Sequence, residues 1–344
     1  MEPILKVEGL TKLFPVKKQK LIEERRYVHA VEDVSFEVYE GGTLGIVGES
    51  GSGKSTLARA ILALTPVTSG SVFYQGEDIT NFRVGAAERK RLRSELQMVF
   101  QDPYASLNPR MKIGEAIVEP MLINGQAKNR TEAREKACHL LETVGLRPEV
   151  YDRFPYEFSG GQRQRIGIVR ALSVNPKLLF CDESVSALDV SVQAQILNLF
   201  NELKQQFNLT YVFIGHDLAV IRYISDQIMV MYLGKIMEIA PYDQLFGEDT
   251  HPYTQALVSA VPEPSTAGRN QRILLEGDIP SPVNPPDGCR FCNRCFKAEE
   301  ICKREEPEMT RVGDRHWIRC HFAKPARENF GQASRDGSKT AGSV

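Results

Sequence analysis

The sequence contains no long apolar run and no excess of charge of one sign. None of its 344 residues belongs to a stretch of about 18 apolar residues, the length that a membrane-spanning helix needs, and no apolar signal region begins the chain. The formal net charge is −1, so the composition gives no sign of a nucleic-acid-binding surface. We therefore expect a soluble, cytoplasmic chain that reaches a membrane only through a partner.

Cysteine is scarce until the C-terminal region. Cys138 and Cys181 stand alone, whereas the other five of the seven cysteines crowd into one short stretch. These five are Cys289, Cys292, Cys295, Cys302 and Cys320. In a reducing compartment such crowding favours a metal site over disulfides. Four spaced thiolates suit a [4Fe–4S] cluster or a tetrahedral Zn²⁺ ion, and the residues alone leave open these two and no metal at all.

A glycine-rich segment lies between a predicted buried strand at residues 43–47 and a predicted helix at residues 57–62. It fits the phosphate-binding pattern G-x-x-x-x-G-K-[ST]. Its residues are Gly48, Glu49, Ser50, Gly51, Ser52, Gly53, Lys54, Ser55 and Thr56. Glycines let backbone N–H groups curl around a polyphosphate, Lys54 supplies a point charge for the β- and γ-phosphates, and the Ser55 hydroxyl suits Mg²⁺. The segment predicts a P-loop.

Four further candidates lie at the carboxyl ends of three predicted strands. The strand at residues 178–183 ends in Asp182, which can hold Mg²⁺ through water, and Glu183, which can polarise an attacking water. Solvated charges are the alternative, but the P-loop would supply the metal that these acids need. His216 follows the strand at residues 210–214, where ligands bind in open α/β sheets, although a structural histidine is equally open. Gln101 follows the strand at residues 96–100, and taken alone it favours a surface turn.

A second glycine-rich turn precedes the helix predicted at residues 163–173. It consists of Ser159, Gly160, Gly161 and Gln162, a serine cap with two glycines that is by itself a weak anion-site signal. A basic helix is predicted at residues 87–95, and apolar periodicity predicts helices at residues 131–146 (with Thr131 as its cap) and 192–207. Strands are predicted at residues 4–7, 34–38, 71–74 and 227–232, and another begins near residue 234. The alternation of strands and helices predicts an α/β fold.

Taken together, these motifs resemble the nucleotide-binding subunit of an ATP-binding cassette transporter over residues 4–262. The resemblance rests on the P-loop, the Q-loop glutamine Gln101, a signature motif at residues 158–162, the Walker B strand at residues 178–183, the D-loop with Asp189, and the switch histidine His216. Phe158 begins the signature where the family most often has leucine. Phe14 falls where the family stacks an aromatic ring on adenine. Ser184 replaces the family's usual proline after the catalytic glutamate.

The resemblance implies a P-loop NTPase fold with a RecA-like core, an antiparallel β subdomain and a helical subdomain at about residues 102–160. It implies an ATPase that uses ATP and Mg²⁺, with Ser55, Asp182 and Gln101 at the metal. Glu183 would be the catalytic base, and His216 and Gln101 would sense the γ-phosphate. A head-to-tail dimer with itself or a paralogous ATPase is expected. In that dimer, Ser159 to Gln162 meet the partner's ATP, and residues 104–109 lie near the groove for the permease.

A narrower resemblance covers the chain to about residue 322. Residues 251–257, 275–282 and 284–286 are similar to the oligopeptide/dipeptide importer subfamily. Residues 13–15 and 54–57 look more like the second than the first of that subfamily's two ATPases. The resemblance implies a peripheral subunit on the cytoplasmic face of a bacterial or archaeal membrane. It would power peptide uptake with two permease subunits and an extracytoplasmic solute-binding protein, and would not bind nucleic acid.

Two alternatives to peptide uptake stay open. Other importers of this kind carry nickel, glutathione or sugars, and soluble cassette ATPases act on DNA or ribosomes.

The subfamily's cysteine pattern, associated with an iron–sulfur cluster in some members, falls on Cys289, Cys295, Cys302 and Cys320, and Cys292 is extra. We expect an ATPase domain at residues 1–262, a Cys-rich module too poor in large apolar residues for its own core at residues 263–324, and a disordered tail at residues 325–344. No function is assigned to residues 17–28.

Overall fold

The structure, a computed structural model, describes residues 2–17, 25–102, 104–247, 249–261 and 272–326. In these residues the larger of two sheets has the strand order β11-β12-β10-β9-β3-β8-β7-β6. The five central strands β9, β3, β8, β7 and β6 run parallel, as apolar strands that are buried on both faces do. The strands are β3 (Thr43–Val47), β6 (Leu96–Val99), β7 (Leu178–Asp182), β8 (Thr210–Gly215), β9 (Gln227–Tyr232), β10 (Lys235–Pro241), β11 (Met309–Gly313) and β12 (His316–Arg319).

The second sheet is antiparallel, with the order β2-β1-β4-β5. Its strands are β1 (Leu5–Pro15), β2 (Tyr27–Val38), β4 (Ser69–Tyr74) and β5 (Glu77–Asp78). β1 and β2 are longer than the strands predicted at residues 4–7 and 34–38, because their pairing continues beyond the apolar core, to Phe14 opposite Val28 and Pro15 opposite Tyr27. Of the segment at residues 17–28, residues 18–24 lie outside the described residues.

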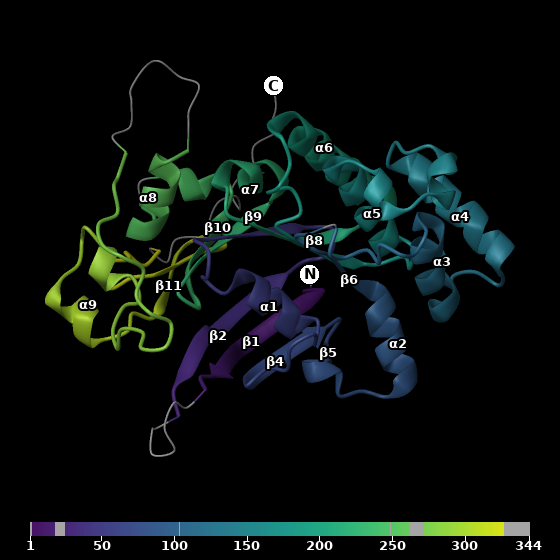
Figure 1. Cartoon of the computed structure of the whole chain (residues 1–344). Coiled ribbons are helices and arrows are strands. Elements are labelled where there is room, and N and C mark those ends of the chain that lie inside the picture. The colour runs from purple at the N-terminus through teal and green to yellow at the C-terminus, as the bar shows by residue number, and fades with distance from the viewer. Residues whose placement is uncertain (1, 18–24, 103, 248, 262–271, 327–344) are drawn as a thin grey trace, which may run out of the picture.

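Helices cover the parallel sheet and fill the space between the two sheets (Figure 1). α1 contacts β1 and β2 of the antiparallel sheet and β7 of the parallel sheet. The helices are α1 (Lys54–Ile61), α2 (Ala86–Glu95), α3 (Ile113–Asn124), α4 (Arg130–Thr143), α5 (Gly160–Leu172), α6 (Val190–Phe207), α7 (Leu218–Ile224), α8 (Pro252–Ser259) and α9 (Glu300–Arg304). Within the described ranges, no helix is both long and apolar enough to cross a bilayer.

The helices α3 and α4 project at one end of the molecule, at the right of Figure 1. They lie within the range predicted as a helical subdomain. α4 ends before Val144, and its N-cap is Asn129, whose side-chain oxygen accepts from the Glu132 N–H at 3.0 Å. The predicted Thr131 cap is therefore wrong, because a better cap residue stands two positions earlier. α3 was not predicted from the pattern, and it carries Pro120 in its interior.

The Cys-rich end of the chain joins the parallel sheet instead of standing apart from it. β12 pairs with β10, with Trp317 opposite Ile239 and Ile318 opposite Glu238. The Phe291 ring is fully buried, with its centroid 5.3 Å from that of Tyr232. This end therefore buries Phe291 and Ile318 against the rest of the chain, whereas Phe296, Ile301 and Phe322 stay exposed. The division near residue 262 stays a prediction, and residues 262–271 and 327–344 lie outside the described residues.

Candidate functional site

The P-loop connects β3 to α1, and its glycines are placed where backbone from other elements comes close. Gly53, the N-cap of α1, has φ +102°. A Cβ atom at Gly53 would lie 2.1 Å from the Ala30 carbonyl oxygen, and one at Gly48 would lie 2.1 Å from the Met231 carbonyl oxygen. Only glycine fits at these two positions, which hold the loop against β2 and β9.

Lys54 lies inside this loop and is almost fully buried. Its Nζ donates to the carbonyl oxygens of Gly48 at 2.7 Å and Glu49 at 2.9 Å. Burial lowers the pKa of the ammonium, while the negative charges of Glu183, Asp182 and Glu49 oppose that shift. The loop thus encloses a cation within the electrostatic reach of three carboxylates.

Asp182, at the carboxyl end of β7, lies against the start of α1. The Ser55 hydroxyl donates to Asp182 Oδ1 at 2.6 Å. Asp182 Oδ2 is buried and has no hydrogen-bond partner among the described residues, and Arg59 Nη2 is 4.0 Å away. Burial raises the pKa of this carboxyl group. A buried carboxylate oxygen without a hydrogen bond, beside a serine hydroxyl, is a donor set that fits Mg²⁺.

The three predicted catalytic side chains meet at Glu183. Gln101 Nε2 donates to Glu183 Oε2 at 2.8 Å, and His216 Nδ1 lies 3.7 Å from the same oxygen. Glu183 has a left-handed φ of +44°, and its N–H donates to the Ile214 carbonyl at 2.9 Å. A non-glycine residue in this region of φ is strained, which costs stability. The hydrogen bond to Ile214 of β8 holds Glu183 in this conformation.

The turn after Glu183 is held without a proline. Ser184 is buried, and its hydroxyl has no hydrogen-bond partner among the described residues. Ser186 instead bonds to the Glu183 carbonyl oxygen, through its N–H at 3.2 Å and its hydroxyl at 2.9 Å. Serine at position 184 therefore leaves the turn closed and the acid at its strand end.

The other predicted nucleotide-binding residues do not gather at this P-loop. Ser159 and Gln162 form a capping box at the start of α5, which Figure 1 places away from α1. No hydrogen bond joins the described residues of this turn to the P-loop. Asp189 stands at the N-cap position of α6. Phe14, at the end of β1, is 38% exposed, and Lys12 Nζ lies 4.7 Å from its ring centroid.

Two residues that the sequence pattern does not single out contact the P-loop. The buried Tyr253 hydroxyl accepts from the Glu49 N–H at 2.9 Å. Arg294 Nη1 lies 2.7 Å from Glu49 Oε2. Tyr253 belongs to the stretch at residues 251–257, which only the family resemblance marked. Arg294 stands between two cysteines and no local pattern points to the P-loop.

The cysteines do not fit the metal site predicted for them. Among the residues that the structure describes, no three or more His, Cys, Asp or Glu side chains form a group that could hold a metal ion. Burial raises the pKa of the Cys289 thiol to about 12 and also raises those of Cys292, Cys295 and Cys320. These shifts describe the thiols without a metal, whose binding would itself remove their protons. Without such a group among the described residues, the set of Cys289, Cys295, Cys302 and Cys320 is unsupported here.

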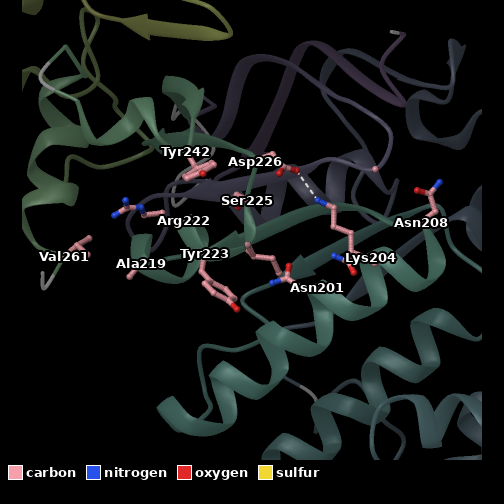
Figure 2. Close-up of a pocket in the computed structure, with 13 residues that line it drawn as sticks. Asn201, Lys204, Asn208, Ala219, Arg222, Tyr223, Ser225, Asp226, Tyr242 and Val261 are labelled. Atoms are coloured by element: carbon pink, nitrogen blue, oxygen red, sulfur yellow. Dashed lines mark hydrogen bonds and ion pairs between the residues drawn. The ribbon is translucent and has the colours of Figure 1, made fainter. Parts of the chain in front are cut away.

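Two surface hollows are lined by residues outside the P-loop. One, of about 1070 Å³, is lined by Gly41, Asn208 and Asp226, which precede β3, β8 and β9. Figure 2 shows Lys204 reaching across it to Asp226, with Nζ 3.0 Å from Oδ2. Because these residues mark the amino ends of parallel strands, this hollow is on the sheet edge opposite the P-loop and is not the nucleotide site.

The second hollow is a groove of about 970 Å³ beside the helical end of the molecule. Its lining includes Phe82, Phe100, Met111, Ala116 of α3 and Arg170 of α5. Phe100 immediately precedes Gln101 in the chain, so a ligand in this groove would contact the residue next to a side chain that bonds to Glu183.

Family models match two parts of the chain. The model described as ABC transporter matches residues 31–186, and the one described as oligopeptide/dipeptide transporter, C-terminal region, matches residues 237–302. The second match includes most of β10 and four of the five clustered cysteines, and it ends before β12. The two models therefore follow the same order along the chain as the motifs do.

The chain is also similar to proteins with curated names. It is 49% identical over 323 residues to the oligopeptide transport ATP-binding protein AppF of Bacillus subtilis (strain 168), covering 93% of this chain and 98% of that protein. It is 48% identical to the di/tripeptide transport ATP-binding protein DppF of Pseudomonas aeruginosa (strain UCBPP-PA14), covering 94% and 99%. Among solved structures, the ATP-binding cassette MJ0796 in a dimeric, post-hydrolysis state bound to ADP and Pi is 29% identical, with a TM-score of 0.60, covering 69% of this chain and 98% of that one.

Proposed function

Because the chain belongs to the ATP-binding cassette ATPases of the oligopeptide/dipeptide transporter group, we propose that it hydrolyses ATP to power peptide uptake through a membrane permease. The observation that carries the proposal is the meeting of Gln101, Glu183 and His216 beside the P-loop. These residues come from the ends of β6, β7 and β8, and the Glu183 carboxylate is the group that the other two face. A base at the strand ends next to a phosphate-binding loop is the arrangement that phosphoryl transfer to water needs.

In the proposed reaction, the P-loop N–H groups and Lys54 bind the β- and γ-phosphates of ATP. Ser55, Asp182 and Gln101 would hold Mg²⁺, which when bound neutralises charge on the phosphates. Glu183 accepts a proton from the attacking water and orients it, while Gln101 and His216 contact Glu183 and report whether a γ-phosphate is present. Phe14 would lie against the adenine ring.

The second half of the ATP site would come from another subunit. The exposed start of α5, with Ser159, Gly160, Gly161 and Gln162, and Asp189 of the D-loop are free of this chain's own P-loop, which supports a head-to-tail dimer with itself or a paralogue. The dimeric state of the MJ0796 cassette supports the same arrangement. The groove beside Gln101 suits a permease segment, and two permeases with a solute-binding protein would complete the importer. Affinity purification from native membranes tests this, since recovery without any integral membrane protein would contradict it.

Replacing Glu183 with glutamine tests the chemistry. Glu183→Gln keeps the shape and the contact with Gln101 but removes the base, so we expect turnover to fall at least about 100-fold with the affinity for ATP unchanged. Steady-state phosphate release and calorimetric ATP titration measure the two quantities. Glu202→Gln, at an exposed position of α6, is the matched control and should behave as wild type. Normal turnover by Glu183→Gln would remove the proposed role.

The iron–sulfur cluster or Zn²⁺ stays a separate prediction that the arrangement of the thiols does not support. It is checked by measuring iron and zinc in protein purified without oxygen. A stoichiometric metal that is lost in Cys289→Ser would establish the site, and the absence of both metals would end the hypothesis. The ATPase proposal does not depend on the result.

A further inference from the structure

The Cys-rich end of the chain touches the P-loop through one ion pair. Arg294, the last residue of the turn Cys292–Arg294, places Nη1 2.7 Å from Oε2 of Glu49, the second residue of the P-loop. The two residues are 245 positions apart in the sequence. The Arg294 side chain is 10% exposed and that of Glu49 is 25% exposed. The pair is therefore screened by water much less than an ordinary surface salt bridge.

An aromatic cluster fixes the position of Arg294. The centroid of the Tyr232 ring lies 5.8 Å from the Arg294 guanidinium carbon. This ring packs against Phe291 and Tyr253. The Tyr253 hydroxyl in turn accepts a hydrogen bond from the Glu49 N–H. Tyr232 ends β9 and Tyr253 is the second residue of α8, so the P-loop and Arg294 contact the same aromatic cluster. Glu49 is thus held at both its backbone and its side chain by residues outside the P-loop.

The charge of Glu49 matters because of where it stands. Its carboxylate acts on the Lys54 ammonium, the cation proposed to meet the phosphates. A negative charge at that place would also repel a triphosphate in the loop, unless a cation compensates it. Among the described residues, Arg294 is the cation that forms an ion pair with this carboxylate.

We propose that Arg294 is a positioning residue for ATP binding: it neutralises the Glu49 carboxylate and so links the Cys-rich end of the chain to nucleotide affinity. The inference rests on the proposed function, since it assigns a role next to the same P-loop. The Cys-rich end then contributes to the ATP site through its fold, because the turn that carries Arg294 must stay docked on Tyr232 for the charge to reach Glu49.

The test measures the affinity of the full-length chain for a non-hydrolysable ATP analogue, together with kcat at saturating ATP. Arg294→Met leaves the Glu49 carboxylate uncompensated, so we expect a Kd raised about tenfold and a kcat within about twofold of wild type. The defect should shrink as salt screens the repulsion. Glu49→Gln removes the charge to be compensated, so the double variant Arg294→Met/Glu49→Gln should bind the analogue within about threefold of Glu49→Gln alone.

Further variants separate charge from packing. Arg294→Lys keeps the positive charge, so its Kd for the analogue should stay within about threefold of wild type. If Arg294→Met does not fold, a Kd of Arg294→Lys raised about tenfold would overturn the inference. Arg304→Met removes an exposed arginine of α9 and should change nothing. A double variant as defective as Arg294→Met, or a defect insensitive to salt, would overturn the compensation. Wild-type protein that binds no analogue would instead overturn the proposed function, whereas normal binding by Arg294→Met would overturn only this inference.

Discussion

Two glycines of the P-loop have the same backbone handedness but different surroundings. Gly51 has φ +80° and Gly53 has φ +102°. Nothing lies within 4 Å of a Cβ atom built at Gly51, whereas one at Gly53 would lie 2.1 Å from the Ala30 carbonyl oxygen of β2. Gly51 therefore supplies only backbone freedom, while Gly53 also allows the loop to touch the antiparallel sheet.

This difference predicts unequal costs for the same substitution. Gly51→Ala should lower the free energy of unfolding by about 1–2 kcal/mol, the cost of a left-handed residue with a Cβ. Gly53→Ala should lower it by more than about 3 kcal/mol, because the methyl group also meets backbone that cannot move away. Urea unfolding without nucleotide measures both. Equal losses in the two variants would show that contact with β2 does not constrain the loop.

At the scale of elements, the N-terminus of α8 carries a buried histidine. His251 Nδ1 accepts from the Tyr253 N–H at 3.0 Å, and Pro252 occupies the first turn. Burial lowers the pKa of His251 to about 3 from an ordinary 6.5. Nδ1 can accept this hydrogen bond only while the His251 ring is neutral. The cap of α8 therefore requires that His251 stay unprotonated, at pH values where the same residue is protonated in the unfolded chain.

This linkage predicts an acid-sensitive stability. Between pH 6.5 and pH 3 the unfolded chain binds a proton at His251 that the folded chain does not, so stability is complete above pH 6.5 and falls with decreasing pH. From pH 7 to pH 5 the loss should be about 2 kcal/mol. His251→Asn keeps an oxygen that can cap α8 but has no group that titrates. Between pH 7 and pH 5 this variant should therefore lose about 2 kcal/mol less stability than wild type. Parallel urea titrations at the two pH values check this; the same pH dependence in both proteins would contradict it.

At the scale of the whole molecule, the sheet continues from the ATPase into the Cys-rich end. Trp317, the one tryptophan of the chain, stands on β12 opposite Ile239 of β10. It also packs against the hydrophobic core that contains β1, β3 and α1. β12 therefore extends the sheet beyond β10, although His316 of β12 lies 78 positions after its hydrogen-bond partner Glu238 of β10.

The shared sheet predicts a single cooperative transition. Trp317 fluorescence follows the C-terminal strands and far-UV circular dichroism follows the whole chain, so their urea midpoints should coincide. Trp317→Phe should remove the fluorescence transition and leave the circular dichroism midpoint within about 0.5 M of wild type. Fluorescence that changes at clearly lower urea would mean that the Cys-rich end unfolds as an independent module.

The sequence by itself determined the elements and chemical groups that depend on local order. Short apolar runs located the parallel strands, and fixed spacing located Lys54 and Ser55, because a P-loop is a continuous segment. Adjacent acids at the end of one strand located Asp182 and Glu183 for the same reason. The cap of α4, the length of β1 and β2, and α3 were less accessible, because pairing and tertiary packing extend or stabilise segments whose own pattern is weak.

Only the tertiary structure decided which distant side chains meet. Gln101 read alone favours a surface turn, yet parallel neighbours β6 and β7 bring its amide to Glu183. Arg294 had no local signal at all, since its partner Glu49 is reached through the docking of Phe291 on Tyr232 and Tyr253. The Cys-rich end is poor in apolar residues for a core of its own, and it instead buries Phe291 together with Ile318 of β12 against elements of the rest of the chain. Such contacts depend on burial and strand order, which no short stretch of sequence contains.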